Sequence, residues 1–251
     1  MHVDLTGKTV LVTGASRGIG AAIATALAGS GATVAVHCSA SPDEAAAIAA
    51  ACGREARVFV ADLADPAACQ RLWQEVIAHY GRVDVLVNNA GVATAAVDAS
   101  IDRWLEIWNH TLDVNLRATA LLCRLATDHF IARGGGRIIN ISSRAAFRGD
   151  QPDYIAYAAS KGGMVALTRS IARGFGKQGV VAFNVAPGFT RTAMAQDFID
   201  QYGEDYAVSD IALTRLTEPK DIAPTVVFLA SGLADHATGA TIDINAASYV
   251  H

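Results

Sequence analysis

Short apolar runs rich in β-branched residues alternate with longer stretches of helical spacing along the whole chain, and this alternation constrains the fold most strongly. Seven runs have the length of a strand: 9–13, 33–36, 57–61, 83–88, 137–142, 180–186 and 240–245. Most are apolar throughout, which is typical of a parallel sheet covered on both faces. Helical stretches between consecutive strands predict βαβ crossovers, and therefore an α/β, Rossmann-like, doubly wound, seven-stranded parallel sheet. Because no linker or repeat interrupts the pattern, residues 1–251 are predicted to form one domain.

Composition narrows the class of protein. Of the 251 residues, 52% are hydrophobic, which is enough for a large core, and the net charge of −4 argues against a nucleic-acid binder. The N-terminal apolar run is too short for a membrane span or a signal peptide. The four cysteines are widely spaced and form no C-x-x-C pair, which predicts free thiols in a reducing compartment and no metal site. We therefore expect a soluble cytoplasmic protein.

Residues 189–215 break the alternation, because they mix acids with aromatic residues over a long connection. Connections of this length in a compact domain are usually functional, so an active-site lid is predicted. A surface helical hairpin without a role is the alternative.

A glycine-rich turn, TGASRGIG (13–20), follows the first predicted strand and opens the first predicted helix. Gly14, Gly18 and Gly20 permit a tight turn and a close backbone approach, and the helix N-terminus offers free N–H groups to a pyrophosphate. Ser16 and Ile19 belong to the same predicted cradle. No Lys-Ser/Thr pair follows the glycines, which disfavours a P-loop nucleotide hydrolase.

The end of the second strand bears on the choice of dinucleotide. It reads VHCSAS (36–41) and has no carboxylate before Asp43, whereas an acid there would bind the adenosine ribose and repel a 2′-phosphate. Arg17 and Ser39 are candidates to bind that phosphate. NADP(H) is therefore favoured and NAD(H) stays open, as does a merely solvated Arg17.

Three motifs in one order carry a family resemblance: the glycine turn, NNAG (88–91), and a serine ahead of Y-x-x-x-K (157–161). Tyr157 and Lys161 alone would indicate only a tyrosine and a lysine on one helix face. Together the motifs resemble the short-chain dehydrogenase/reductase family over residues 7–245. The closing pattern RLTEPKDIAPTVVFLAS is most similar to 3-oxoacyl-acyl-carrier-protein reductases and related ketone reductases.

The resemblance implies catalytic roles for four residues. Tyr157 would protonate the substrate carbonyl, and Lys161 would hold the nicotinamide ribose and lower the pKa of Tyr157. Ser143 would hydrogen-bond the carbonyl, with its neighbour Ser142 as the weaker alternative. Asn115 would anchor a water in a proton relay that reaches Lys161.

The resemblance also implies further cofactor contacts, to which Asn115, Tyr157 and Lys161 contribute. One group lies near the adenine and consists of Asp62 and Leu63. A second group lines the cofactor and consists of Asn88, Asn89, Ala90 and Gly91. A third group binds the carboxamide and consists of Pro187, Gly188, Thr190 and Thr192.

Some positions depart from the family pattern. The loop between Ser143 and Tyr157 is unusually charged and is expected to border the substrate, and Ala246 and Ala247 stand where relatives usually have glycines. Gly162 and Gly163 lie inside a predicted helix, where glycine costs about 1 kcal/mol relative to alanine. The resemblance implies that this helix forms a dimer face, within a homotetramer or a homodimer, and packing within one subunit is the alternative.

The predicted function is reduction of a ketone by NAD(P)H, with a 3-oxoacyl thioester or a small or cyclic ketone as substrate. An acyl-carrier-protein partner would need basic residues near the entrance. Candidates are Arg133, Arg137, Arg169, Arg173 and Lys177, although the net negative charge weakens this case. The alternatives are an NAD-dependent alcohol dehydrogenase in a catabolic route, an epimerase or dehydratase, and a non-catalytic dinucleotide-binding regulator.

Overall fold

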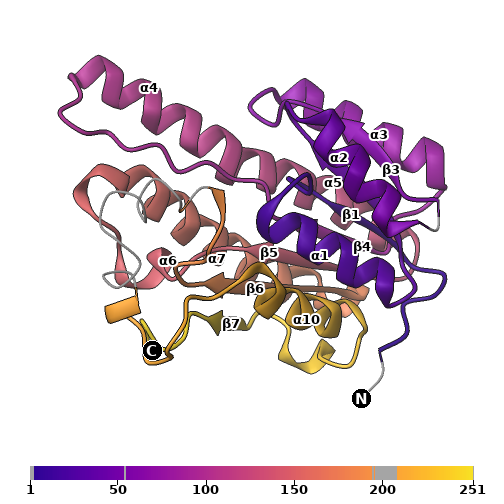
Figure 1. Ribbon diagram of the computed structural model, residues 1–251. Coiled ribbons are helices and arrows are strands. Elements are labelled where there is room, and N and C mark those ends of the chain that lie inside the picture. The colour runs from indigo at the N-terminus through magenta and orange to yellow at the C-terminus, as the bar shows by residue number, and fades with distance from the viewer. Residues whose placement is uncertain (1–2, 54, 194, 196–207, 251) are drawn as a thin grey trace.

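A seven-stranded parallel sheet forms the centre of the molecule, with the strand order β3-β2-β1-β4-β5-β6-β7 (Figure 1). The computed structural model describes residues 3–53, 55–193, 195 and 208–250. The strands are β1 (Thr9–Val12), β2 (Thr33–Cys38), β3 (Arg57–Val60), β4 (Val85–Asn88), β5 (Gly136–Ile141), β6 (Val180–Pro187) and β7 (Thr241–Ile244). Every predicted strand is confirmed, as are the parallel sheet and the Rossmann-like class.

The strand order creates a switch point between β1 and β4. The chain runs outward from β1 through β2 to β3 and then returns to place β4 on the other side of β1. In the register of the sheet, Val10 pairs with Val34 of β2 and with Val85 of β4. In doubly wound sheets, ligands bind outside the carboxyl ends of the strands at such a point.

Helices cover both faces of the sheet and give the molecule two apolar cores (Figure 1). One core joins the sheet to α1, α2 and α10, and the other joins it to α3, α5 and α7. The main helices are α1 (Gly18–Gly29), α2 (Pro42–Cys52), α3 (Pro66–Tyr80), α4 (Ile101–Leu112), α5 (Ala118–Ala132), α7 (Ile155–Phe175) and α10 (Pro219–Ala230), with a short α6 (Ala145–Arg148). No helix in the described ranges is both long and apolar enough to cross a membrane.

A π-helical turn, Asp113–Arg117, joins α4 to α5. Helix α4 extends beyond the sheet, as Figure 1 shows, while α5 packs within the second core. Single π turns inside longer helices occur frequently at functional sites, and this one contains Asn115.

The predicted lid can be followed only in part, because residues 194 and 196–207 lie outside the described residues. On its near side, Thr190 forms a parallel bridge with Thr217. On its far side, Asp210 forms ion pairs with Arg144 and Arg148.

Candidate active site

The glycine turn after β1 can be built only with glycine at two of its positions. Gly14 has a φ of +62°, and a Cβ there would lie 2.8 Å from the Cα of Ala90. A Cβ on Gly20 would overlap the carbonyl oxygen of Gly14. The turn therefore lies directly against the segment that follows β4.

The N-terminus of α1 is left without an acidic partner. No side chain caps it and no acidic residue lies in its first turn, whereas α2 has Asp43 and Glu44 there. Asp65 caps α3 by accepting from the N–H of Ala67 at 2.8 Å. An uncapped helix N-terminus behind a glycine turn is suited to bind a pyrophosphate, so the residues fit a dinucleotide.

Thr13, which the sequence analysis did not single out, ties the glycine turn to the NNAG segment. Its Oγ1 accepts from the N–H of Asn89 at 3.0 Å and of Ala90 at 3.1 Å. In return, the Asn89 amide donates to the carbonyls of Thr13 and Gly14, both at 2.9 Å. Asn88 points elsewhere, because it is buried and donates to Asn140 on β5 at 2.8 Å.

The predicted contacts to adenosine lie at the start of α1 and just beyond the carboxyl ends of β2 and β3. Arg17 and Ser39 are exposed, as a pair that binds a 2′-phosphate must be. Asp62 is also exposed, and its Oδ1 accepts from the N–H of Ala64 at 2.9 Å, while Leu63 beside it is buried.

Lys161 lies on α7 and is only 3% exposed. Its Nζ donates to the carbonyl of Ile141, at the end of β5, at 2.9 Å, and lies 5.6 Å from the centre of the Tyr157 ring. Burial lowers the pKa of Lys161 from 10.5 to about 8. The buried ammonium is therefore held at the carboxyl end of β5 by its hydrogen bond to the Ile141 carbonyl.

Burial dominates at Tyr157 and raises the pKa of its phenol, while a hydrogen bond with Ser143 opposes that rise and the negative charge of Asp150 adds to it. The predicted lowering of this pKa is not observed, because burial of the phenol outweighs the effect that lowers it. The Lys161 ammonium lies near the ring and donates to the Ile141 carbonyl. Of the two adjacent serines, Ser143 reaches Tyr157, while the Ser142 hydroxyl donates to the carbonyl of Val185 at 3.3 Å.

Asn115 is fully buried in the π-helical turn, and its amide is fixed in one orientation. Its Oδ1 accepts from the N–H of Val92 at 2.8 Å, and its Nδ2 donates to the Val92 carbonyl at 2.9 Å and to Ser160 at 3.0 Å. A Cβ on Gly91 would lie 3.3 Å from the Asn115 Oδ1 and 3.4 Å from the Lys161 Nζ. The Asn115 amide and the Lys161 ammonium therefore both lie next to the backbone of Gly91.

The segment after β6 returns to the glycine turn. Pro187 ends β6, and a Cβ on Gly188 would lie 2.7 Å from the Cα of Asn245. A Cβ on Gly18 would lie 3.4 Å from the Thr192 Cγ2, whereas Thr190 is buried and donates to the Gly188 carbonyl at 3.0 Å. The segment that is predicted to bind the carboxamide therefore packs against the start of α1.

The charged loop after Ser143 is joined to two distant segments. Arg144 and Arg148 both donate to Oδ2 of Asp210, at 2.7 and 2.9 Å. The Phe147 ring stacks on Tyr249 with a centroid separation of 6.0 Å. The loop next to Ser143 therefore carries both paired charges and stacked aromatic rings.

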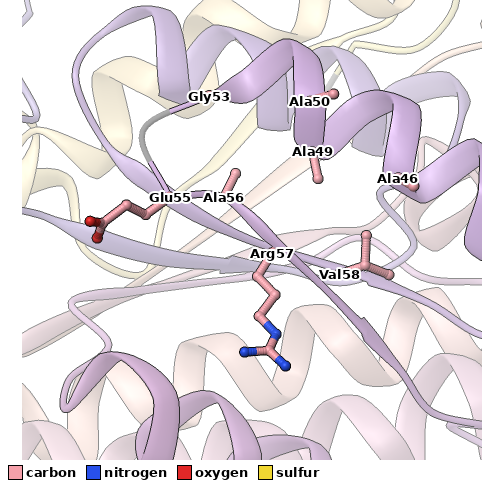
Figure 2. Close-up of a pocket in the computed structure, with 8 residues that line it drawn as sticks. All are labelled: Ala46, Ala49, Ala50, Gly53, Glu55, Ala56, Arg57 and Val58. Carbon is pink, nitrogen blue, oxygen red and sulfur yellow. The ribbon is translucent and has the colours of Figure 1, made fainter.

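A hollow of about 470 Å³ lies elsewhere, between α2 and the start of β3 (Figure 2). Four alanines line most of it, with Glu55 and Arg57 at its rim. None of the predicted catalytic residues contributes to it, so it is not the candidate site. In the described part of the chain, no three His, Cys, Asp or Glu side chains gather to hold a metal ion.

Comparison with known proteins assigns the family. The model of the short chain dehydrogenase family matches residues 8–203. The chain is 37% identical to the 3-oxoacyl-[acyl-carrier-protein] reductase FabG of Staphylococcus aureus over 247 residues, covering 97% of this chain and 98% of the relative. It is 39% identical to the D-threitol dehydrogenase of Mycolicibacterium smegmatis over 244 residues, covering 96% of this chain and 92% of that one.

A solved structure agrees with this assignment. The short chain dehydrogenase from Burkholderia cenocepacia J2315, in complex with NADP, superposes with a TM-score of 0.89 at 35% identity, covering 97% of this chain and 98% of the other. The chain is therefore an oxidoreductase of the short-chain dehydrogenase/reductase family, whose members bind nicotinamide dinucleotides.

Proposed function

We propose that this protein interconverts a ketone and a secondary alcohol with NADP(H), using Tyr157 as the general acid and base. One observation carries the proposal. The carboxyl edge of the sheet brings together Ser143, Tyr157, Lys161 and Asn115, beside the glycine turn and the uncapped N-terminus of α1.

Each residue has a role that follows from its position. Ser143 holds the substrate carbonyl oxygen next to the Tyr157 hydroxyl, with which it shares a hydrogen bond. Tyr157 gives its proton to that oxygen during reduction and takes it back during oxidation. A bound nicotinamide supplies the hydride to the carbonyl carbon, or accepts it in the reverse direction. During reduction, Lys161 and a water held by Asn115 would pass a proton from solvent to Tyr157, and the same relay would carry it back during oxidation.

The preference for NADP(H) rests on charge. The end of β2 has no carboxylate to repel a 2′-phosphate, and Arg17 is exposed at the start of α1. The similar Burkholderia enzyme binds NADP. NAD(H) is the alternative cofactor.

For the substrate, the 3-oxoacyl thioester of an acyl carrier protein is one candidate, since a 3-oxoacyl-[acyl-carrier-protein] reductase is 37% identical. An acidic carrier would need basic residues at the entrance to the site. Arg133, Arg173 and Lys177 are exposed but lie at the C-terminal ends of α5 and α7, at the edge of the sheet where β5 and β6 begin and opposite the site, so they do not supply it. Arg137 is already paired with Asp235 at 2.7 Å, so it is not available.

A small hydroxylated alcohol, oxidised in the reverse direction, is the second candidate. The observation that favours it is the charged loop next to Ser143, because guanidinium and carboxylate groups bind hydroxyls better than they bind an acyl chain. The D-threitol dehydrogenase, at 39% identity, points the same way.

The protein is further proposed to form a homotetramer or homodimer in the cytoplasm. Val97, Ile101 and Leu105 are exposed at the start of α4, beside stacked Trp104 and Trp108 rings. Contiguous exposed apolar surface of this kind indicates an interface. All four cysteines are free and buried, which fits a reducing compartment.

A two-direction activity panel tests the proposed substrates. NADPH and NADH oxidation would be followed with a 3-oxoacyl thioester and with small and cyclic ketones, and NADP⁺ reduction with polyols and sugars. The proposal predicts turnover with NADPH and at least one ketone. Turnover with NADH alone would contradict the cofactor assignment.

A further inference from the structure

His37 is a buried imidazole at the carboxyl end of β2, only 1% exposed, and nothing in the proposed chemistry uses it. Its Nδ1 accepts a hydrogen bond from the N–H of Gly14 at 3.1 Å. Its Nε2 lies 3.0 Å from the carbonyl oxygen of Ala61, just beyond the end of β3. The backbone adds to this, because the His37 carbonyl accepts from the N–H of Ala15 at 2.8 Å.

The two partners fix the tautomer of the ring. Because Nδ1 accepts from Gly14, the proton of the neutral ring is on Nε2 and is donated to Ala61. Burial lowers the pKa of His37 to about 4, against a smaller opposing effect of the Ala61 carbonyl, so the ring is neutral near pH 7.

The ring connects two parts of the dinucleotide site that are far apart in the sequence. Gly14 is the first glycine of the phosphate-binding turn, and Ala61 directly precedes Asp62, at the predicted adenine side. On its opposite flank, the same turn is held by the Asn89 amide. His37 is therefore the side chain that holds the turn on the β2–β3 flank.

We propose that His37 is a positioning residue for the dinucleotide: its Nδ1 bond to Gly14 and its Nε2 bond to Ala61 set the spacing between the phosphate-binding turn and the adenine wall. This inference rests on the proposed binding of NADP(H). The acceptor at Nδ1 is the decisive feature, because it is the partner of the Gly14 N–H at the start of the phosphate-binding turn.

Two substitutions separate the two hydrogen bonds. In His37→Asn, Oδ1 takes the place of Nδ1 and keeps the acceptor for Gly14. In His37→Gln, the amide reaches toward Ala61 and leaves the Gly14 N–H unpaired. We expect the Kd for NADPH, measured by fluorescence titration, to rise about tenfold in His37→Gln. His37→Asn should stay within about threefold of the wild type, and kcat at saturating NADPH should be unchanged in both.

His129 on α5 offers a matched control, since its Nε2 also accepts from a backbone N–H, that of Val83 at 3.3 Å, away from the glycine turn. His129→Asn should lower the Tm without changing the Kd. Equal NADPH affinity in wild type, His37→Asn and His37→Gln would overturn the proposal, and so would equal weakening in both variants. A wild type that binds neither NADPH nor NADH would instead refute the proposed function.

A measurement on the wild type keeps the test independent of variant folding. Nitrogen NMR of the histidine ring should show an Nε2–H tautomer that persists well below the ordinary histidine pKa. An Nδ1–H tautomer, or a ring that titrates near 6.5, would contradict the assigned bonds.

Discussion

Lys161, a residue of the proposed active site, lowers the stability of the fold because its ammonium is buried. Its pKa falls from 10.5 in the unfolded chain to about 8 in the folded one, because the ammonium is buried. Between these values the unfolded chain binds more protons, so stability rises as the pH increases from about 8 to 10.5. Below that window the folded protein carries the full cost of the buried charge, about 3 kcal/mol.

The first prediction is that Lys161→Met raises the free energy of unfolding at pH 7 by up to about 3 kcal/mol while activity falls at least about a hundredfold. Chemical denaturation and initial rates measure the two effects. The exposed Lys177 supplies the control, as Lys177→Met should change neither. A variant that is less stable than the wild type at pH 7 would contradict the account.

Asp150 acts through its charge on the phenol of Tyr157, the proposed general acid. Because the carboxylate disfavours the phenolate, Asp150→Asn should lower the pKa of Tyr157. Alcohol oxidation needs the phenolate, so the pH–rate profile for oxidation should move toward lower pH, and the move should shrink at high salt. Asp153→Asn, which removes a neighbouring acid that does not influence Tyr157, should leave the profile in place. A move toward higher pH would refute this assignment.

Arg17 tests the choice of dinucleotide. Its guanidinium is exposed at the start of α1, where it can pair with a 2′-phosphate. Arg17→Ala should therefore raise the Kd for NADPH about tenfold and leave that for NADH nearly unchanged. Titration with both cofactors measures this. An equal loss for the two would show that Arg17 binds the shared pyrophosphate, and unchanged affinity for both would show that it binds neither phosphate; either result would contradict the assignment.

At the scale of elements, strands were the most predictable part of the chain. Apolar β-branched runs gave all seven, with ends that differ from those observed by one or two residues. The π-helical turn around Asn115 was not predicted, because neither spacing nor composition distinguishes it from a continuous helix. Gly163 packs against Leu116 of the same chain, whose Cδ2 would lie 2.7 Å from a Cβ at that position and would have to shift, so a small residue is favoured within the subunit while the dimer face stays a prediction.

The turn after β7 carries strain that the sequence only hinted at. Ala246 and Ala247 have φ values of +50° and +58°, in the left-handed region where alanine is disfavoured. Replacing either with glycine removes a cost of about 1–2 kcal/mol and adds about 0.5–1 kcal/mol of chain entropy, so each should stabilise by up to about 1 kcal/mol. Thermal unfolding measures this. Ala240→Gly is the control. Ala240 is outside the left-handed region, so this substitution should lower the stability of the protein.

At the scale of the whole molecule, the motifs predicted a set of residues that the structure brings together at the carboxyl edge of the sheet, but not the contacts that orient them. Thr13, His37 and Ser160 were missed because their hydrogen bonds join residues far apart in the sequence, such as Thr13 to Asn89 and Ser160 to Asn115. The pKa of Tyr157 was predicted with the wrong sign, since burial depends on how α7 packs against the sheet and not on the spacing to Lys161.

The most direct test of the account compares wild type and Tyr157→Phe in NADPH oxidation with a ketone that the wild type reduces, with NADPH binding measured in the same samples. The account predicts equal NADPH affinity and a rate at least about a hundredfold lower in the variant, because only the proton donor is lost. A variant that keeps the wild-type rate would show that the proton comes from another group, and the assignment of Tyr157 would be wrong.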